Sequence, residues 1–329
     1  MSPSLPAVPL LSRSAVDRDH PARSRPALFD ELWEEPATRV LPMWRGRALF
    51  ARPDVLSSDR TPALALLPVS EVTSALVRVY LGRALENSDG IPVGAAIVAE
   101  ILTDAAAAEL EPDESRWVGL RESAPLLSDL DAGLYTEALS IANWHESHIH
   151  CPRCGSPTVV EMGGWVRRCI SDNTEHFPRT DPAIIVSVLD RDDRILLGSN
   201  AMWENNRFSI LAGFVEPGES FEAAVLREIF EESGIRVVDP EYLGSQPWPF
   251  PRSVMIGYTA RIADDQDPAD LQADGEEILD LRWFTRSELW EERERVILPG
   301  PSSIARAIIE HWYGGPLSEP PGAASVSSA

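Results

Sequence analysis

The residues best placed to do chemistry are acidic side chains that recur within one short stretch of the sequence. Glu228, Glu231 and Glu232 are spaced so that, on a helix, they lie within roughly 100° of arc. Three carboxylates so close together repel one another, and the arrangement becomes favourable when a divalent cation lies among them. Carboxylate oxygens are hard ligands that suit Mg²⁺ or Mn²⁺. The stretch therefore predicts a metal-binding helix, and the alternative is an exposed helix with a solvated acidic face.

Neighbouring residues support the metal-binding interpretation. Glu219 lies near the expected helix start, where a negative charge suits the helix dipole. Gly213 and Gly218 allow the preceding loop to bend tightly and to bring backbone close to the metal ions. The side of the helix that faces the core is expected to consist of Leu226, Ile229 and Phe230.

The whole segment from Gly213 to Ile235 resembles the Nudix box. It has a glycine, five residues, a glutamate, seven residues, and then Arg-Glu-apolar-x-Glu-Glu-x-Gly-apolar. The resemblance to the Nudix hydrolase family implies an α/β fold, an α/β/α sandwich with a mixed sheet. It also implies hydrolysis of a nucleoside diphosphate linked to another group, because metal ions neutralise phosphoryl charge and lower the pKa of the attacking water.

The same resemblance implies a role for each residue of the box. Glu228 and Glu232 would bind the metal ions together with the backbone carbonyl of Ala212. Glu231 would assist the metal ions or position water. Arg227 would orient a glutamate through an ion pair. A protein that had lost catalysis would normally lack one of the glutamates, so a non-catalytic binding or regulatory protein is the less favoured alternative.

A second motif, Ser-Gln-Pro-Trp-Pro-Phe-Pro-Arg-Ser at residues 245–253, follows the box. Its prolines make the backbone stiff and extended, and its two aromatic rings could stack on a flat ligand. Alone, it could equally be a rigid connection or a protein–protein groove. Together with the box it resembles the signature of the NADH pyrophosphatase subfamily. The resemblance implies substrate contacts by Gln246, Pro247, Trp248, Pro249, Phe250, Pro251, Arg252, Ser253, Phe177, Phe214 and the backbone of Ala305.

A remote acidic residue completes the metal ligands that the subfamily resemblance implies. Glu277 aligns with that ligand, and Glu276 beside it leaves an ambiguity of one residue. Without the resemblance, either glutamate would be an ordinary surface residue.

The three cysteines suggest a structural zinc site. Cys151 and Cys154 form a Cys-x-x-Cys knuckle, and Cys169 follows about fifteen residues later. The subfamily has four cysteines here, but Asp172 occupies the position of the fourth. Asp172 or His176 could complete a Zn²⁺ site, and the alternative is a degenerate ribbon without metal.

The remaining sequence predicts the elements that must position these residues. We expect a flexible segment at 1–26, a strand-rich α/β domain at 27–148, a zinc-ribbon-like segment at 149–178, a Nudix domain at 179–313 and a disordered tail at 314–329. In the second of these segments, strands are expected near 39–43, 63–68 and 95–102, with a helix at 131–148. In the Nudix domain, strands are expected at 182–189, 195–198, 209–215, 237–243, 254–262 and 279–284, with helices at 220–232 and 303–312.

Composition limits the possible partners. The net charge of −23 argues against a general nucleic-acid binder, which needs a basic face. No apolar run reaches about 18 residues and the N-terminus lacks a signal-peptide pattern, so no membrane partner and a cytoplasmic location are expected. The sequence thus predicts an NAD(H) diphosphatase. The subfamily resemblance adds NAD-capped RNA as a substrate, which the acidic charge ranks second to the free dinucleotide, and it implies a homodimer. The alternative is a Nudix hydrolase that prefers ADP-ribose or diadenosine polyphosphates.

Overall fold

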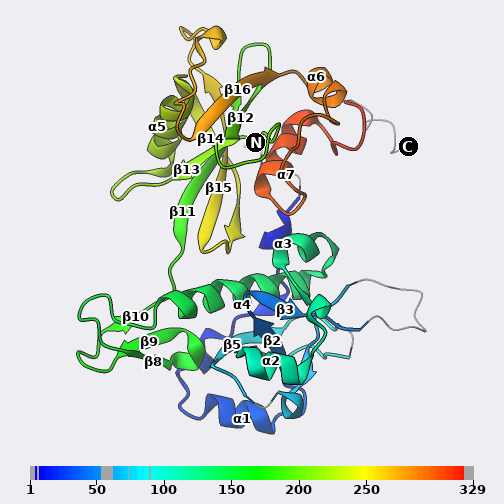
Figure 1. The fold of residues 1–329 in the computed structure, drawn as a ribbon, viewed down its shortest axis with the longest axis vertical. Coiled ribbons are helices and arrows are strands. Elements are labelled where there is room, and N and C mark those ends of the chain that lie inside the picture. Colours follow the sequence, from blue (N-terminus) through cyan, green and yellow to red (C-terminus); the bar gives the residue numbers. More distant parts are fainter. Residues whose placement is uncertain (1–3, 6, 53–61, 73, 89, 322–329) are drawn as a thin grey trace. The chain divides into compact units, whose positions relative to one another are not determined.

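The computed structural model describes residues 4–5, 7–52, 62–72, 74–88 and 90–321. The chain forms two compact units. One comprises residues 11–180 and 249–252, and the other comprises residues 1–10, 181–248 and 253–329. Each unit has its own sheet, shown in Figure 1.

The first unit is built on a seven-stranded sheet with the order β1-β5-β6-β2-β3-β7, in which β4 also pairs with β2. Strands β2 and β6 are parallel and the other pairs are antiparallel. The strands are β1 Val16–Asp17, β2 Arg39–Trp44, β3 Arg47–Leu49, β4 Leu67–Pro68, β5 Val77–Ala84, β6 Ala96–Ile101 and β7 Trp117–Val118. The strands expected near 39–43 and 95–102 are confirmed, whereas only the last two residues of 63–68 form a strand.

Helix α4 (Asp129–Ser147) contacts this sheet and confirms the helix expected at 131–148. It begins at Ser128, whose hydroxyl accepts a hydrogen bond from the Asp131 amide and so satisfies a free N–H of the first turn. Shorter helices complete the unit: α1 Leu28–Glu34, α2 Asp104–Leu110 and α3 Leu120–Ser123.

The cysteine-containing segment forms a small three-stranded sheet within the same unit. Its strands are β8 Thr158–Glu161, β9 Val166–Cys169 and β10 Glu175–His176. His145 of α4 joins this sheet to the helix, because its Nε2 lies 2.8 Å from the Gly164 carbonyl and its Nδ1 lies 2.9 Å from Arg167 Nη1. Arg167 can only donate, so Nδ1 accepts and Nε2 carries the proton of a neutral ring.

Residues 11–26 do not form the flexible segment that their composition suggested. Strand β1 pairs with β5, and Leu11 and Ala22 are buried. The few apolar side chains in this Pro-, Ser- and Arg-rich stretch suffice to pack it against the sheet. Residue Leu5 belongs to the other unit, where its amide donates to the Leu243 carbonyl.

The second unit contains a mixed six-stranded sheet with the order β14-β15-β11-β12-β16, in which β13 also pairs with β11. Strands β11 and β15 are parallel and the remaining pairs are antiparallel. The strands are β11 Asp181–Leu189, β12 Ile195–Asn200, β13 Leu211–Phe214, β14 Val237–Trp248, β15 Ser253–Ile262 and β16 Ile278–Phe284. All six expected strands are present, and β14 continues into the second motif.

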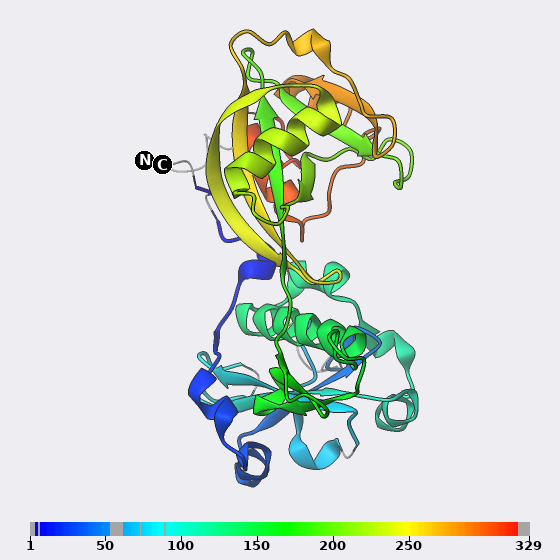
Figure 2. The same ribbon diagram turned by 90° about the vertical axis from the view of Figure 1, so that its left-hand side faces the viewer.

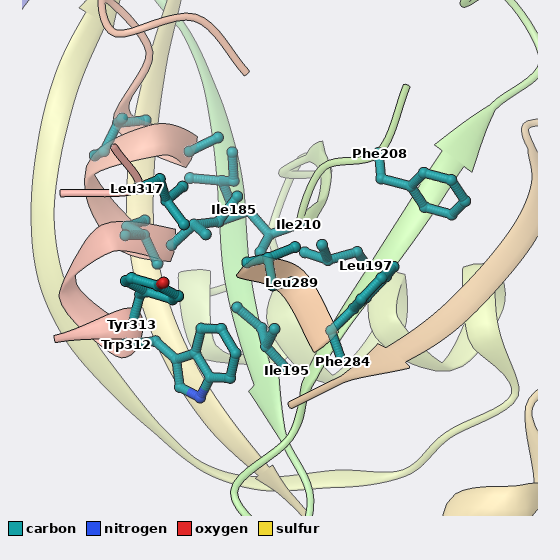
Figure 3. Packing of buried hydrophobic residues seen from close by; sticks show 14 of the residues in the cluster. Ile185, Ile195, Leu197, Phe208, Ile210, Phe284, Leu289, Trp312, Tyr313 and Leu317 are labelled. Carbon is teal, nitrogen blue, oxygen red and sulfur yellow. The ribbon is translucent and has the colours of Figure 1, made fainter. Parts of the chain in front are cut away.

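Helices cover both faces of this sheet, as Figure 2 shows for α5 (Phe221–Ser233). Side chains of β11 alternate between two cores: Ile184 packs with the α5 side, and Ile185 packs with α7 (Ile304–Tyr313) and α6 (Arg286–Glu291). Figure 3 shows the second core, where Ile185 and Leu197 of the sheet face the helix that carries Trp312 and Tyr313. The α/β/α sandwich with a mixed sheet is confirmed.

The beginning of the expected disordered tail is ordered. Leu317 is buried in the core beside α7, and its amide donates to Glu310 Oε1 at 3.1 Å. Tyr313 donates to the Glu319 carbonyl. Burial of Leu317 and these two hydrogen bonds hold the stretch against the helix, and residues 322–329 of the expected tail lie outside the described residues. None of the helices in the described residues is both long and apolar enough to cross a bilayer.

Candidate active site and metal centres

Helix α5 carries the acidic residues, and local sequence signals fix its ends. The Ser220 hydroxyl accepts a hydrogen bond from the Ala223 amide, and Gly234 ends the helix with φ of 70°. Val225, Ile229 and Glu232, at helical spacing, are buried toward the sheet. This spacing places Glu232 on the inner face and leaves Glu231 exposed.

The expectation that Leu226 and Phe230 face the core is wrong. Their exposed fractions are 43% and 53%, whereas Ile229 is fully buried. Each follows a buried residue by one position, which turns it about 100° away from the sheet. Ala224 and Val225 supply the inner face instead.

Arg227 connects the carboxylates that surround it. Its Nε and Nη2 donate to the two oxygens of Glu219, both at 2.8 Å, and its Nη1 donates to Glu231 at 2.9 Å. Nη1 also lies 3.0 Å from Glu228 Oε1, and Nη2 donates to the Phe214 carbonyl. The hydrogen bonds from Arg227 lower the pKa of Glu219 to about 2. Arg227 thus holds the preceding loop and the helix in one arrangement.

Glu232 is the most unusual carboxyl group of the helix. It is 4% exposed, and its Oε2 has no hydrogen-bond partner among the residues that the structure describes. Burial, followed by the negative charges of Glu277 and Glu228, raises its pKa to about 8. Burial likewise raises the pKa of Glu228. A buried carboxylate with an unpartnered oxygen and acidic neighbours is stabilised by a cation, so these residues fit divalent ions.

The carboxylates of Glu228, Glu232 and Glu277 influence one another electrostatically but do not form a compact set of ligands. Within the described residues, Glu228, Glu232 and Glu277 do not form a group whose ligand atoms all lie within 4.8 Å of one another. Their mutual influence appears in the pKa values of Glu228 and Glu232, both of which the Glu277 charge raises.

Strand β13 brings backbone directly against the glutamates. A Cβ added to Gly213 would lie 2.0 Å from the carboxyl carbon of Glu228, so a side chain there would have to push the Glu228 carboxylate aside. Ala212, the expected carbonyl ligand, is the preceding residue of this strand and pairs with Ile185 of β11. Gly218, with φ of +90°, makes the turn before the helix.

The second motif forms the end of the β-hairpin that β14 and β15 make. Residues 245–248 close β14, Trp248 pairs with Ser253 of β15, and the turn at 249–252 packs in the other unit. There, the Asn143 amide donates to the carbonyls of Pro249 and Pro251, and the Arg121 guanidinium lies 4.1 Å from the Phe250 ring centroid. Sequence reasoning missed Asn143 and Arg121, because helices α4 and α3, which carry them, contain no motif.

The Gln246 side chain does not face solvent, as a substrate contact would require. It is 0% exposed, and its Nε2 donates to the Ser302 carbonyl at 2.9 Å. It therefore ties β14 to the start of α7. Ala305 is also buried, whereas Phe177 and Phe214 are exposed aromatic faces.

The cysteines do gather into a possible metal site. The ligand atoms of Cys151, Cys154, Cys169 and Asp172 all lie within 4.8 Å of one another, and the Cys154 and Cys169 sulfurs are 3.4 Å apart. Such a set fits tetrahedral Zn²⁺. His176, the other candidate for the fourth ligand, lies in β10 opposite Arg167 and outside this group.

Comparison with known families accounts for most of the chain. Residues 178–301 match the NUDIX domain, and residues 146–177 match the NADH pyrophosphatase zinc ribbon domain. Residues 37–144, which carry no motif recognisable from the sequence, match the NADH pyrophosphatase-like rudimentary NUDIX domain.

Curated relatives agree with these matches. The NAD-capped RNA hydrolase NudC of Mycobacterium bovis (strain BCG / Pasteur 1173P2) is 40% identical over 273 residues, which cover 76% of this chain and 86% of the relative. NudC of Mycobacterium tuberculosis (strain ATCC 25618 / H37Rv) shows the same identity and coverage. The NAD-capped RNA hydrolase NUDT12 of Homo sapiens is 37% identical over 200 residues, which cover 56% of this chain and 42% of the relative. The chain therefore belongs to the Nudix hydrolase family and, within it, to the NADH pyrophosphatase subfamily.

Proposed function

We propose that this enzyme hydrolyses the diphosphate of NADH or NAD to nicotinamide mononucleotide and AMP. The observation that carries the proposal is the buried carboxylate of Glu232, whose Oε2 lacks a partner in the described structure and which feels the charges of Glu228 and Glu277. This set of oxygen donors suits Mg²⁺ or Mn²⁺. Bound there, such ions neutralise the diphosphate and increase the acidity of the water that attacks it.

The protein's own residues would prepare the site for this reaction. Because residue 213 is a glycine, the Glu228 carboxylate of the helix can lie directly against the backbone of β13. Arg227 holds Glu219 and Glu231 in place, because its ion pairs fix both carboxylates. Preorganised charges of this kind avoid reorganisation when the phosphorus is attacked.

The aromatic residues would bind the flat rings of the dinucleotide. Trp248 and Phe250 lie at the end of a stiff hairpin, and Phe214 and Phe177 present exposed rings. Further substrate contacts would come from Pro247, Pro249, Pro251, Arg252 and Ser253, and from the backbone of Ala305. For Gln246 we propose an indirect role, in which its bond to Ser302 holds the start of α7.

NAD-capped RNA is a second proposed substrate, supported by the similarity to NudC and NUDT12, which are NAD-capped RNA hydrolases. The net charge of −23 opposes extended contact with an RNA backbone. We therefore expect recognition of the cap dinucleotide to dominate and free NADH or NAD to be the better substrate at low ionic strength.

The test compares NADH, NAD, NAD-capped RNA, ADP-ribose and diadenosine polyphosphates with Mg²⁺ or Mn²⁺ present. We expect NADH and NAD to give nicotinamide mononucleotide and AMP. Much faster turnover of ADP-ribose or diadenosine polyphosphates would instead assign a different substrate preference. A protein that binds NADH without cleaving any of the five would be a binding protein.

The Glu232→Gln variant tests the catalytic assignment. Because the amide keeps the shape of the side chain but cannot bind a cation as a carboxylate does, we expect turnover to fall about a hundredfold or more. Glu241→Gln, at an exposed position of β14, is the matched control and should retain wild-type activity. Wild-type activity in Glu232→Gln would refute the assignment.

We also propose that Cys151, Cys154, Cys169 and Asp172 bind one structural Zn²⁺ ion. Support comes from the spacing of their ligand atoms and from the match to a zinc ribbon domain. Zinc quantification on purified protein should give about one ion per chain. Asp172→Ala should lower the zinc content, and His176→Ala should not; the reverse result would make His176 the ligand.

A homodimer and a cytoplasmic location are further proposals, supported by the subfamily resemblance and by the lack of a spanning helix in the described residues. Light scattering of the full chain should give twice the 36.2 kDa chain mass. A mass of one chain across the working concentration range would contradict the dimer.

A further inference from the structure

The loop before β16 holds Glu277 from several sides. Asp274 Oδ1 accepts hydrogen bonds from the amides of Glu276, Glu277 and Ile278, at 2.8, 2.9 and 2.9 Å. The Glu277 carbonyl accepts from the Ala201 amide at 2.8 Å. The backbone of Glu277 is therefore fixed although its side chain is exposed.

Asn200, the last residue of β12, fixes the Glu277 side chain. Its Nδ2 lies 3.2 Å from Glu277 Oε1, and its Oδ1 accepts from the Met202 amide at 2.9 Å. The second bond settles the orientation of the amide group, since only the oxygen can accept from an N–H. The nitrogen must then point toward the Glu277 carboxylate.

An amide is well suited to this task. A lysine or arginine in its place would form an ion pair with Glu277 and compete with a cation for the carboxylate. Asn200 orders the carboxylate and leaves its negative charge available. An exposed glutamate otherwise loses side-chain freedom when a metal ion orders it, and prior ordering reduces that loss.

The position of Glu277 explains why its order matters. Strand β16, which it precedes, contacts α5, and the Glu277 charge acts on both Glu228 and Glu232. We propose that Asn200 is a positioning residue whose side-chain amide holds the Glu277 carboxylate in place for the divalent ions bound by α5. The inference rests on the proposed function, because it assumes that those ions serve the hydrolysis.

Asn200→Ser tests the proposal in the full-length protein. Serine can still accept from the Met202 amide and keep the turn, but it is too short to reach Glu277. We expect the Kd for Mn²⁺, measured by electron paramagnetic resonance without substrate, to rise about three- to tenfold. The Mn²⁺ concentration for half-maximal hydrolysis should rise by the same factor, with kcat at saturating Mn²⁺ within about twofold of wild type. Asn205→Ala, exposed in the same loop, is the matched control and should change neither value.

A double-mutant cycle separates positioning from a merely structural role. In a Glu277→Gln background, Asn200→Ser should have little further effect on Mn²⁺ binding, because the group that it orients is already lost. An equal loss in both backgrounds, or an unchanged Kd in Asn200→Ser, would overturn the proposal, as would a wild-type chain that binds no Mn²⁺. If wild type binds Mn²⁺ but does not cleave NADH, the proposed function fails while the binding cycle still decides the role of Asn200.

Discussion

Gly213 lies where any added side chain would meet the Glu228 carboxylate. The Glu228 carboxylate occupies the space that a side chain of residue 213 would need, because an added Cβ would lie 2.0 Å from its carboxyl carbon. The obstacle is contact rather than conformation, since the clash arises in ordinary strand backbone of β13. The glycine of the box is therefore explained by the approach of a strand to a carboxylate.

Gly213→Ala should displace the Glu228 carboxylate by about 1 Å or more and lower kcat for NADH about a hundredfold. Steady-state kinetics would measure the change in kcat, and a Mn²⁺ titration would show whether the displaced carboxylate binds the metal ion less well. Gly300→Ala is the matched control, because an added Cβ there meets no atom within 4 Å. Normal kinetics in Gly213→Ala would show that the helix can move away from β13 without loss of function.

Helix α5 depends on its N-cap for the register of its glutamates. The Ser220 hydroxyl satisfies one of the free amides of the first turn. We expect Ser220→Ala to destabilise the unit that contains α5 by about 1 kcal/mol, and Ser220→Thr to restore most of that loss. Urea unfolding followed by circular dichroism would measure the change. Equal midpoints for Ser220→Ala and wild type would show that packing alone sets the start of the helix.

The sequence predicted this element well where the signal was local. The caps Ser220 and Gly234 and the helical spacing of the glutamates lie within one short segment, so the helix and its acidic face followed directly. The exposure of Leu226 did not follow, because an apolar type alone does not tell which face meets the sheet.

Contacts between distant segments explain the other failures. The buried Gln246 side chain donates to the Ser302 carbonyl, 56 residues away in the sequence. Asn200 donates to Glu277 only because strands β12 and β16 pair. No local pattern encodes such pairs. The same limit applied to the rudimentary domain, whose strands were predicted but whose relationship was not.

The stability of the unit that contains α4 should depend on pH. In the unit that contains α4, burial lowers the pKa of His145 from 6.5 to about 4. Between these two pH values, His145 binds a proton in the unfolded chain but not in the folded chain. The free energy of unfolding therefore falls as the pH drops from about 6.5 to 4. The contribution of His145 to the free energy of unfolding is about 3 kcal/mol, and all of it is present above pH 6.5.

Glu137, on the same helix, acts in the opposite direction, because burial raises its pKa to about 7 and its contribution to stability is lost as the pH rises from 4.5 to 7. His145→Gln should therefore flatten the acid limb of the stability curve of this unit, measured by denaturant unfolding between pH 4 and 7. His20→Gln, at an exposed position, should leave it unchanged. An acid limb equally steep in His145→Gln would assign the effect to other groups.

The two units are interleaved along the chain, which crosses from one to the other at residues 10–11, 180–181 and on both sides of 249–252. A protease that cut once, after Thr180, would release neither unit whole. The N-terminal fragment would keep Leu5, which completes the backbone pairing of Leu243, and the C-terminal fragment would keep the turn that Asn143 binds. Expression of residues 1–180 alone would thus include residues 1–10 of the other unit and lack residues 249–252. Expression of residues 181–329 alone would include residues 249–252 and lack residues 1–10.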